Sequence, residues 1–316
     1  MAVERCDYAG YSGCVRLANS QAQVILGPHC GGRVLAYTWE GEEALMLDPK
    51  HDGWTWKPGD PPPPLLCPSG GRFDIGPEQI IPRHPELWLG SWQAEIVDDW
   101  TARMTSVPSD NVGVQLVREF RLAEEGSHLT ITQTMTAMDP SPLATGETRW
   151  CYWSRTFGRG HGICVVPLTP ELSRLPRQYV MYGPGRAIQT APEDPAIRVR
   201  DGFLEVLDTP AHPKLGLDSY AGWFGYLMPN DLLFLKRFPT YPHRVYNEVA
   251  GLTISLWYYQ DIVCELEPIG PMEVLKPGEA ASFTEEWWLA PYPFPAQRDT
   301  LDLPELEEYA HQMMQR

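Results

Sequence analysis

The sequence lacks any apolar run close to the roughly 18 residues that a membrane-spanning helix needs. Its first residues, MAVERCDYAG, carry charges early and contain no apolar segment of the kind found in secretory signals. These two absences lead us to expect no membrane partner and a cytoplasmic protein.

Positive charge is scarce. The chain has 25 Lys and Arg against 41 Asp and Glu, which gives a formal net charge of −16 and a pI near 4.9. Recognition of nucleic acids and of anionic membrane surfaces depends on clustered basic residues. We therefore expect no nucleic-acid partner, and no pattern in the sequence indicates an oligomeric state.

Metal-binding spacings are also missing. The seven cysteines form no C-x-x-C pair, which disfavours zinc ribbons and thioredoxin-like motifs. An alternative gathers His161, His243, Glu265 and Glu267 around a divalent ion, but neither H-x-H nor H-E-x-x-H spacing supports it. The sequence therefore predicts no metal and no cofactor.

Apolar and aromatic residues are plentiful: 43% of the chain is hydrophobic, with 12 Trp and 14 Tyr. Such content suffices for a sizeable core, and flat aromatic side chains can also stack on sugar rings. Short runs of strand-forming residues recur between 27 Gly and 32 Pro, and helical periodicity is confined to residues 303–315. Among these runs, we expect strands over residues 15–26, 88–98, 112–123 and 128–138. We predict an all-β protein, residues 1–316 forming a single large antiparallel β-sandwich domain with a short C-terminal helix.

Two carboxylates on one predicted strand stand out. Residues 258–267 are rich in aromatic and β-branched side chains, and we expect Pro268 and Pro271 to end the strand, since proline donates no ladder hydrogen bond. Alternation with period two puts Glu265 and Glu267 on one face of that strand. Like charges so close require a cation, a ligand, water or a retained proton beside them. A solvated sheet face is the alternative.

The same region carries a resemblance. Cys-Glu-Leu-Glu-Pro at 264–268, Leu-Lys-Pro-Gly-Glu at 275–279 and the Trp-rich strand at 283–289 resemble the C-terminal signature of the galactose mutarotase-like (aldose 1-epimerase) superfamily. The resemblance implies a β-supersandwich and a catalytic glutamate base on this strand. That residue is Glu267 if the Glu-Pro pair is kept, or Glu265 if proximity to Cys264 is kept. We prefer Glu267, with a pKa raised by its neighbour.

Two glycine-rich segments extend the resemblance. Gly-Gly-Arg at 31–33 matches an N-terminal segment where, in the family, paired glycines let one strand cross closely over another. A second Gly-Gly-Arg at 70–72 lies where the family lines its sugar site. By this resemblance Arg72, Glu78 and His84 are candidate substrate-binding residues; a structural loop tied by an Arg–carboxylate pair is the alternative.

Residues 147–166 depart from the family pattern. The family has His-x-Tyr-Phe here, and its histidine is the general acid, whereas this strand carries Trp153 and Arg155 instead. The candidate acids become His161, in a Gly-rich turn, or His243. Trp153 and Arg155 are candidate substrate-binding residues, and Arg groups would fix sugar hydroxyls and stabilise developing negative charge.

Two function classes follow. The first is an aldose 1-epimerase-like sugar isomerase that acts through a carboxylate base and a histidine acid on a small-molecule or oligomeric carbohydrate. The second is a non-catalytic carbohydrate-binding or regulatory module, which the missing histidine motif favours. The dense polar residues of the two Gly-rich segments favour the first class, which we prefer. A polysaccharide lyase is third, since it would need a cationic groove. The fold alone cannot choose among them.

Overall fold

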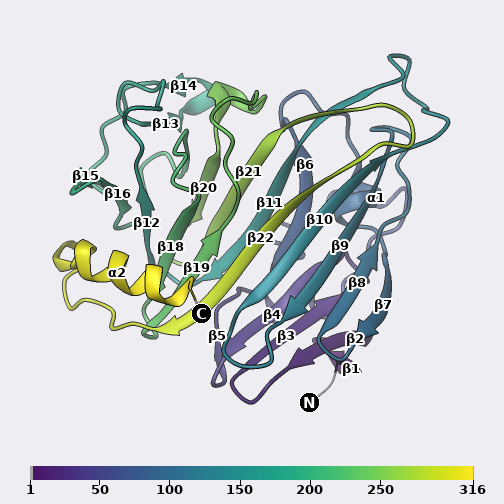
Figure 1. The fold of residues 1–316 in the computed structure, drawn as a ribbon, viewed down its shortest axis with the longest axis horizontal. Helices are drawn as coiled ribbons and strands as arrows, with labels where there is room; N and C mark the ends of the chain where they lie inside the picture. The colour runs from purple at the N-terminus through teal and green to yellow at the C-terminus, as the bar shows by residue number, and fades with distance from the viewer. Residues whose placement is uncertain (1–2, 316) are drawn as a thin grey trace.

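The computed structural model describes residues 3–315 and consists of two large antiparallel sheets packed face to face (Figure 1). This arrangement confirms the predicted all-β sandwich.

The first sheet runs in the order β1-β2-β3-β4-β6-β11-β21-β20-β17-β13-β14, with β5 added to the side of β4. Its strands are β1 (Glu4–Tyr8), β2 (Tyr11–Ala18), β3 (Ala22–Gly27), β4 (Arg33–Trp39), β5 (Glu42–Glu43), β6 (Gly71–Gly76), β11 (Thr148–Arg159), β13 (Tyr179–Tyr182), β14 (Ile188–Gln189), β17 (Lys214–Leu217), β20 (Ile254–Tyr259) and β21 (Val263–Leu275).

The second sheet runs in the order β15-β16-β12-β18-β19-β22-β10-β9-β8-β7. Its strands are β7 (Gln93–Asp98), β8 (Thr101–Thr105), β9 (Val114–Leu122), β10 (Leu129–Ala137), β12 (Ile163–Pro167), β15 (Ile197–Arg200), β16 (Phe203–Val206), β18 (Trp223–Met228), β19 (Leu232–Arg237) and β22 (Ala280–Pro291). Two α-helices, α1 (Pro85–Trp88) and α2 (Leu303–Met313), and four short 3₁₀ turns complete the described chain.

The main core lies between the sheets. Along β9 and β10 every second side chain is fully buried, as the alternating sequence VQLVREFRL predicts. Phe73, Tyr152, Leu266 and Trp287 carry the same core across both sheets. The opposite, outer face of the first sheet lies outside this core and can therefore carry a site.

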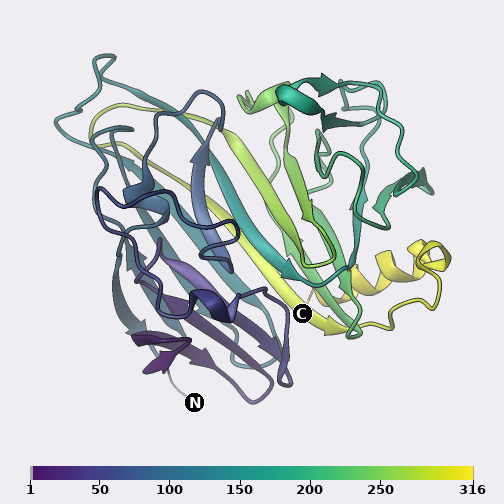
Figure 2. The same ribbon diagram turned by 180° about the vertical axis from the view of Figure 1, so that it is seen from behind.

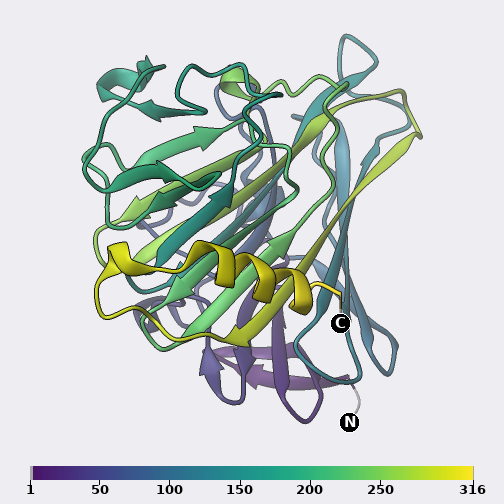
Figure 3. The same cartoon turned by 60° about the vertical axis from the view of Figure 1, so that its left-hand side comes forward.

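Helix α2 covers the outer face of the second sheet (Figure 3). Asp302 caps it by accepting a hydrogen bond from the backbone N–H of Glu305. Leu306 and Ala310 pack against Trp223 and Trp288. The predicted C-terminal helix is confirmed. Neither this helix nor any other among residues 3–315 is long and apolar enough to cross a membrane.

The prediction of one strand over residues 258–267 that ends at Pro268 is wrong. A turn at residues 260–262 separates β20 from β21, and β21 continues through both prolines to Leu275. Regular pairing with β20 stops at Pro268, and the register with β11 shifts between Ile269 and Met272. Pro271 thus sits at a bulge, where a missing ladder donor is tolerated.

Two other boundaries also differ from the predictions. The single strand expected over residues 15–26 is split by a turn in which Asn19 accepts hydrogen bonds from the backbone N–H groups of Gln21 and Ala22. The strand expected over residues 88–98 begins only at Gln93, because residues 85–88 form α1 behind a proline at its first turn.

Gly31 allows two backbone segments, its own and residues 88–90, to lie close together. Its φ is +77°, its N–H bonds to the carbonyl of Gly90 at 2.7 Å, and an added Cβ would lie 2.0 Å from the carbonyl oxygen of Trp88. Gly31→Ala is therefore expected to lower the free energy of unfolding by about 3 kcal/mol or more. Urea denaturation measures this.

Gly41→Ala is the matched control. Gly41 has φ +89° and an added Cβ would meet nothing within 4 Å, so this change carries only the backbone cost of about 1 to 2 kcal/mol. Equal losses in the two variants would contradict the close-approach explanation.

Candidate functional site

A cleft of about 480 Å³ opens on the outer face of the first sheet. The long segment between β5 and β6 folds over this face (Figure 2), and its proline-rich part forms one wall of the cleft. The lining residues are Pro62, Pro63, Pro64, Leu65, Leu66, Cys67, Pro68, Arg72, Glu78, Trp88, Arg155, Phe157, Lys214, Trp257 and Glu265. A recess of about 380 Å³ adjoins it and shares Arg72, Glu78, Trp88 and Arg155.

Strand β21 brings Glu265 to the floor of this cleft and carries Glu267 on the same face. Cys264 and Leu266 point into the core between the sheets, so Glu265 and Glu267 share the opposite face, as period-two alternation predicts. In the register, Phe157 of β11 and Trp257 of β20 lie directly beside Glu265. Two aromatic side chains therefore flank this carboxyl group.

The two carboxyl groups differ in access. Glu265 lines the cleft and is 5% exposed, whereas Glu267 is fully buried beneath and accepts a 2.6 Å hydrogen bond from Trp153 Nε1. One oxygen, Oε1, of each carboxyl has no protein donor. A proton held by Glu265 can be donated to Glu267, because the two carboxyl groups lie within hydrogen-bonding reach of each other.

Their pKa values are pushed in opposite directions. Burial, then the charge of Glu267, raises the pKa of Glu265 to about 8, against the opposing effect of Arg155 and Arg72. Burial also disfavours ionisation of Glu267, but Lys214 and Arg155 outweigh it and lower its pKa. The raised pKa therefore falls on Glu265, and the prediction of a raised pKa for Glu267 is wrong.

Arg155 and Arg72 lie side by side, because β11 and β6 pair them directly. The Arg155 guanidinium lies 4.4 Å from the ring centre of Trp153 and 3.5 Å from Glu78 Oε1. The Arg72 guanidinium lies 4.7 Å from the ring centre of Trp88. Both guanidinium Nε atoms are buried without a hydrogen-bond partner. Arg155 Nε lies 3.7 Å and Arg72 Nη2 3.6 Å from Asp74 Oδ2, so this carboxylate holds both side chains in place.

Lys214 enters the cleft from β17. Its Nζ lies 2.6 Å from Glu78 Oε2, and 5.0 and 5.4 Å from the ring centres of Trp153 and Tyr182. Burial raises the pKa of Glu78, but Arg155 and Lys214 outweigh this effect and lower it to about 2. Glu78 is thus a fixed carboxylate at neutral pH.

His84 and Asp74 form an ion pair in the recess. His84 Nε2 lies 2.9 Å from Asp74 Oδ1, and Nδ1 lies 2.7 Å from the carbonyl of Pro82. Both partners are acceptors, so both ring nitrogens carry protons. Burial lowers the pKa of His84, but the Asp74 hydrogen bond outweighs it and raises the pKa. His84 is therefore an engaged imidazolium beside the cleft.

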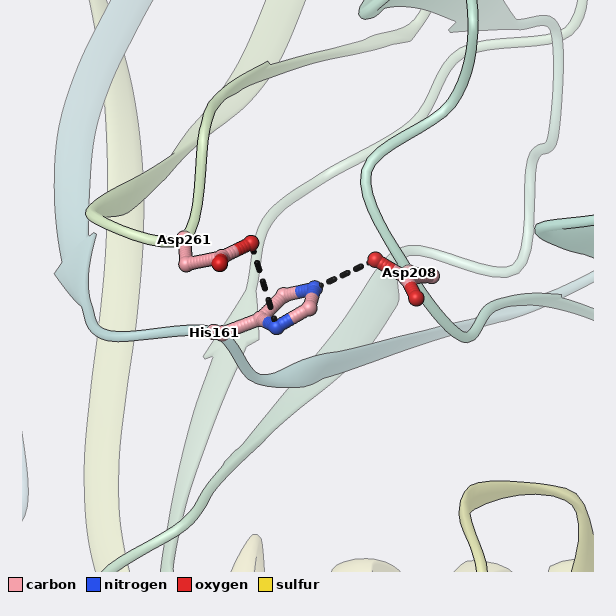
Figure 4. Close-up of side chains that lie close together, drawn as sticks. All are labelled: His161, Asp208 and Asp261. Atoms are coloured by element: carbon pink, nitrogen blue, oxygen red, sulfur yellow. Dashed lines mark ion pairs between the residues drawn. The ribbon is translucent and has the colours of Figure 1, made fainter.

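His161 lies in the turn between β11 and β12, away from the cleft-lining residues. Its Nε2 lies 2.7 Å from Asp208 Oδ1 and its Nδ1 3.5 Å from Asp261 Oδ1, both carboxylates being exposed (Figure 4). Within residues 3–315, these three are the side chains grouped closely enough to hold a metal ion. The half-buried imidazole joins three loops by these contacts.

His243 lies on an exposed loop, where the adjacent Arg244 pairs with Glu273 at 2.7 Å. The structure therefore does not bring His161, His243 and the two glutamates together around one ion. It does bring together Glu265 and Glu267 with the five residues predicted to bind substrate: Arg72, Glu78, His84, Trp153 and Arg155.

A hollow of about 600 Å³ elsewhere, beside β4 and β5, contains another carboxyl group, that of the half-buried Glu43. Glu43 accepts hydrogen bonds from the backbone N–H groups of Tyr37 and Leu45. Its carboxyl is therefore used to hold the β4–β5 turn.

Sequence reasoning did not single out Lys214, Trp88 or Trp257 as site residues. Lys214 begins a four-residue strand after a loop-rich stretch, and Trp257 immediately precedes the segment, residues 258–267, that was expected to be one strand with the glutamates. Only the pairing of β20 with β21 places Trp257 beside Glu265. The sequence does not show in which register these two strands pair, so this neighbour could not be identified from it.

Comparison with known proteins identifies the fold. No family model and no curated protein sequence matches the chain. The Slr1438 protein of Synechocystis sp. PCC 6803 matches with a TM-score of 0.58 at 15% identity, over 91% of this chain and 99% of that one. A galactose mutarotase-like protein of Lactobacillus casei matches at 0.58 and 11% identity, over 88% and 100%. A candidate aldose 1-epimerase of Escherichia coli K12 matches at 0.56 and 11% identity, over 87% and 98%. The chain therefore has the galactose mutarotase-like β-sandwich fold.

Proposed function

We propose that this protein interconverts the anomers of an aldose. The observation that carries the proposal is the Glu265 carboxyl group at the floor of a cleft, with Glu267 buried beside it. The cleft also presents two arginines and the aromatic rings of Trp88 and Trp257. Guanidinium groups suit sugar hydroxyls, and aromatic faces suit the C–H face of a pyranose ring. A carbohydrate ligand and a cytoplasmic location are part of this proposal.

Glu265 is the base in this proposal, because it reaches the cleft while Glu267 lies fully buried beneath it. The base takes the proton of the anomeric hydroxyl, the C1–O5 bond breaks as O5 gains a proton, and rotation about C1–C2 precedes closure. A base with a pKa near the working pH is well suited to this task. The likeness of the fold to mutarotase-like structures supports the sugar chemistry by analogy alone.

The test is anomer exchange followed by NMR after dissolving the pure α-anomer of each sugar in a panel of aldoses. For at least one sugar, we expect anomer exchange to be faster with the protein than without it. Glu273→Gln is the matched control, since Glu273 lies on the same strand but pairs with Arg244 outside the cleft. Its rate should equal that of the wild type.

A non-catalytic carbohydrate-binding module is the second candidate. The specific observation in its favour is that the histidine beside the cleft has both ring nitrogens engaged. Calorimetric binding of a sugar without faster anomer exchange would favour this module. A lyase ranks third, because Arg155 and Lys214 are already paired with Glu78 and leave little free positive charge for uronic acids.

A further inference from the structure

The cleft needs a proton donor for the ring oxygen, and histidine does not supply it. His84 donates through both ring nitrogens to fixed acceptors. His161 and His243 are not among the residues that line the cleft or its recess. The guanidinium groups of Arg72 and Arg155 hold their protons at any working pH. The donor must therefore be another group at the cleft wall.

Two titratable side chains of the cleft wall remain besides the carboxylates, Lys214 and Cys67. Burial raises the pKa of the Cys67 thiol to about 11, and loss of its proton would leave a charge in a buried position. An ammonium group becomes neutral when it gives up a proton. Because a neutral amine has no charge to desolvate, Lys214 is the better donor at this wall.

The position of Lys214 fits this role. Its ammonium is held between the Trp153 and Tyr182 rings and the Glu78 carboxylate. The side chain remains 21% exposed, so the group can reach a ligand. It lines the same cleft as Glu265, and its charge acts on Glu267 beneath. The Lys214 ammonium and the Glu265 carboxyl group thus both line the cleft in which a ligand would bind.

We propose that Lys214 is the general acid of this site, which gives a proton to the sugar ring oxygen while Glu265 removes the proton of the anomeric hydroxyl. The inference rests on the proposed function and adds a catalytic residue to it.

The step balances without a further reactant. In the reactive form Lys214 is an ammonium and Glu265 a carboxylate. Lys214 Nζ–H gives a proton to O5 as the C1–O5 bond breaks, and a Glu265 oxygen takes the O1 proton as the C1=O1 double bond forms. The open-chain aldehyde then faces a neutral amine and a neutral carboxylic acid. After rotation the same transfers run in reverse and restore both charges.

The test removes the amine and adds it back. We expect Lys214→Ala to slow anomer exchange by about 10²- to 10⁴-fold, mainly in kcat, because a lost proton donor acts in the transition state. Methylammonium in the assay should restore activity about tenfold or more. Guanidinium has the same charge but does not give up a proton, so it should not restore activity.

Lys276→Ala is the control, because Lys276 lies in the exposed turn between β21 and β22. It should keep the wild-type rate and show no response to methylammonium. If Lys214→Ala does not fold, Lys214→Gln provides the same comparison with a longer side chain.

The outcomes separate this inference from the proposed function. If the wild type accelerates anomer exchange and the rate of Lys214→Ala is within threefold of the wild-type rate, the acid role of Lys214 is overturned. The proposed epimerase activity then still stands. Equal restoration by methylammonium and guanidinium would show that only charge is needed, which also overturns the acid role. No faster exchange by the wild type with any sugar would remove both proposals.

Discussion

Glu265→Gln is expected to slow anomer exchange by about 10²- to 10⁴-fold, the range that one general base contributes. Glutamine keeps the size of the side chain and its place between Phe157 and Trp257, but it cannot take the anomeric proton. NMR exchange rates at saturating sugar measure the loss. The cleft should still bind the sugar, since Arg72 and Arg155 are unchanged.

The pH dependence of the exchange rate tests the assignment of Glu265 as the base independently. Burial and the charge of Glu267 raise the pKa of Glu265 to about 8, and the base acts only when deprotonated. The wild-type rate should therefore rise as pH increases through about 8. Arg155 and Arg72 are the cations that face Glu265, and they oppose this rise in its pKa.

Glu267→Gln should move that rising limb to lower pH by about one unit or more, because it removes the negative neighbour. It keeps an acceptor for Trp153 Nε1. A limb that stays in place, or a full loss of activity in Glu267→Gln with little loss in Glu265→Gln, would make Glu267 the base instead. A structural role for either residue would change the rate without moving the limb.

The fold was largely readable from the sequence where alternation is strong. Residues 114–122 and 129–137 alternate strictly and were predicted as strands to within two residues. Prediction failed at two kinds of boundary. Pro271 lies within a strand because a bulge in the pairing with β11 accommodates it, and that pairing depends on neighbours far away in the chain. Residues 85–88 form a helix behind a proline at its first turn, a local signal that the prediction overlooked.

The site was partly readable for a similar reason. Alternation alone put Glu265 and Glu267 on one face, and the resemblance pointed to Arg72. The relative depth of the two glutamates could not be read, since it depends on what covers each. Lys214 could not be found either, because β17 reaches β21 only through β20. Side chains that meet across several strands have no fixed spacing in sequence.

Lys236→Met is expected to lower the free energy of unfolding by about 3 to 5 kcal/mol, the cost of leaving one partner of a buried ion pair uncompensated. Lys236 of β19 and Glu285 of β22 are both fully buried, with Nζ and Oε2 2.9 Å apart. Glu285 also accepts hydrogen bonds from Gln133 and Trp287. Methionine fills similar space but leaves the carboxylate without its cation. Urea denaturation at pH 7 measures the loss.

On the core side of the first sheet, this ion pair also contacts the two strands that carry the site, β11 and β21. Lys236 Nζ donates to Thr156 Oγ1 at 3.0 Å and to the carbonyl of Leu266 at 3.3 Å. Leu266 lies between the two glutamates, and Thr156 follows Arg155. The variant should therefore also slow anomer exchange, since both strands lose a contact that fixes their position. A second change, Glu285→Gln, should recover part of the stability by removing the unpaired charge.

Arg237→Met is the control for this prediction. Arg237 is the next residue of the same strand and pairs with Glu286 at 2.7 Å, but its side chain is 41% exposed. Solvent-exposed pairs contribute about 1 kcal/mol or less. If Lys236→Met costs no more than Arg237→Met, the buried pair is not held as charged groups. In that case Lys236 would reach the core as a neutral amine, because burial lowers its pKa and Glu285 opposes this only in part.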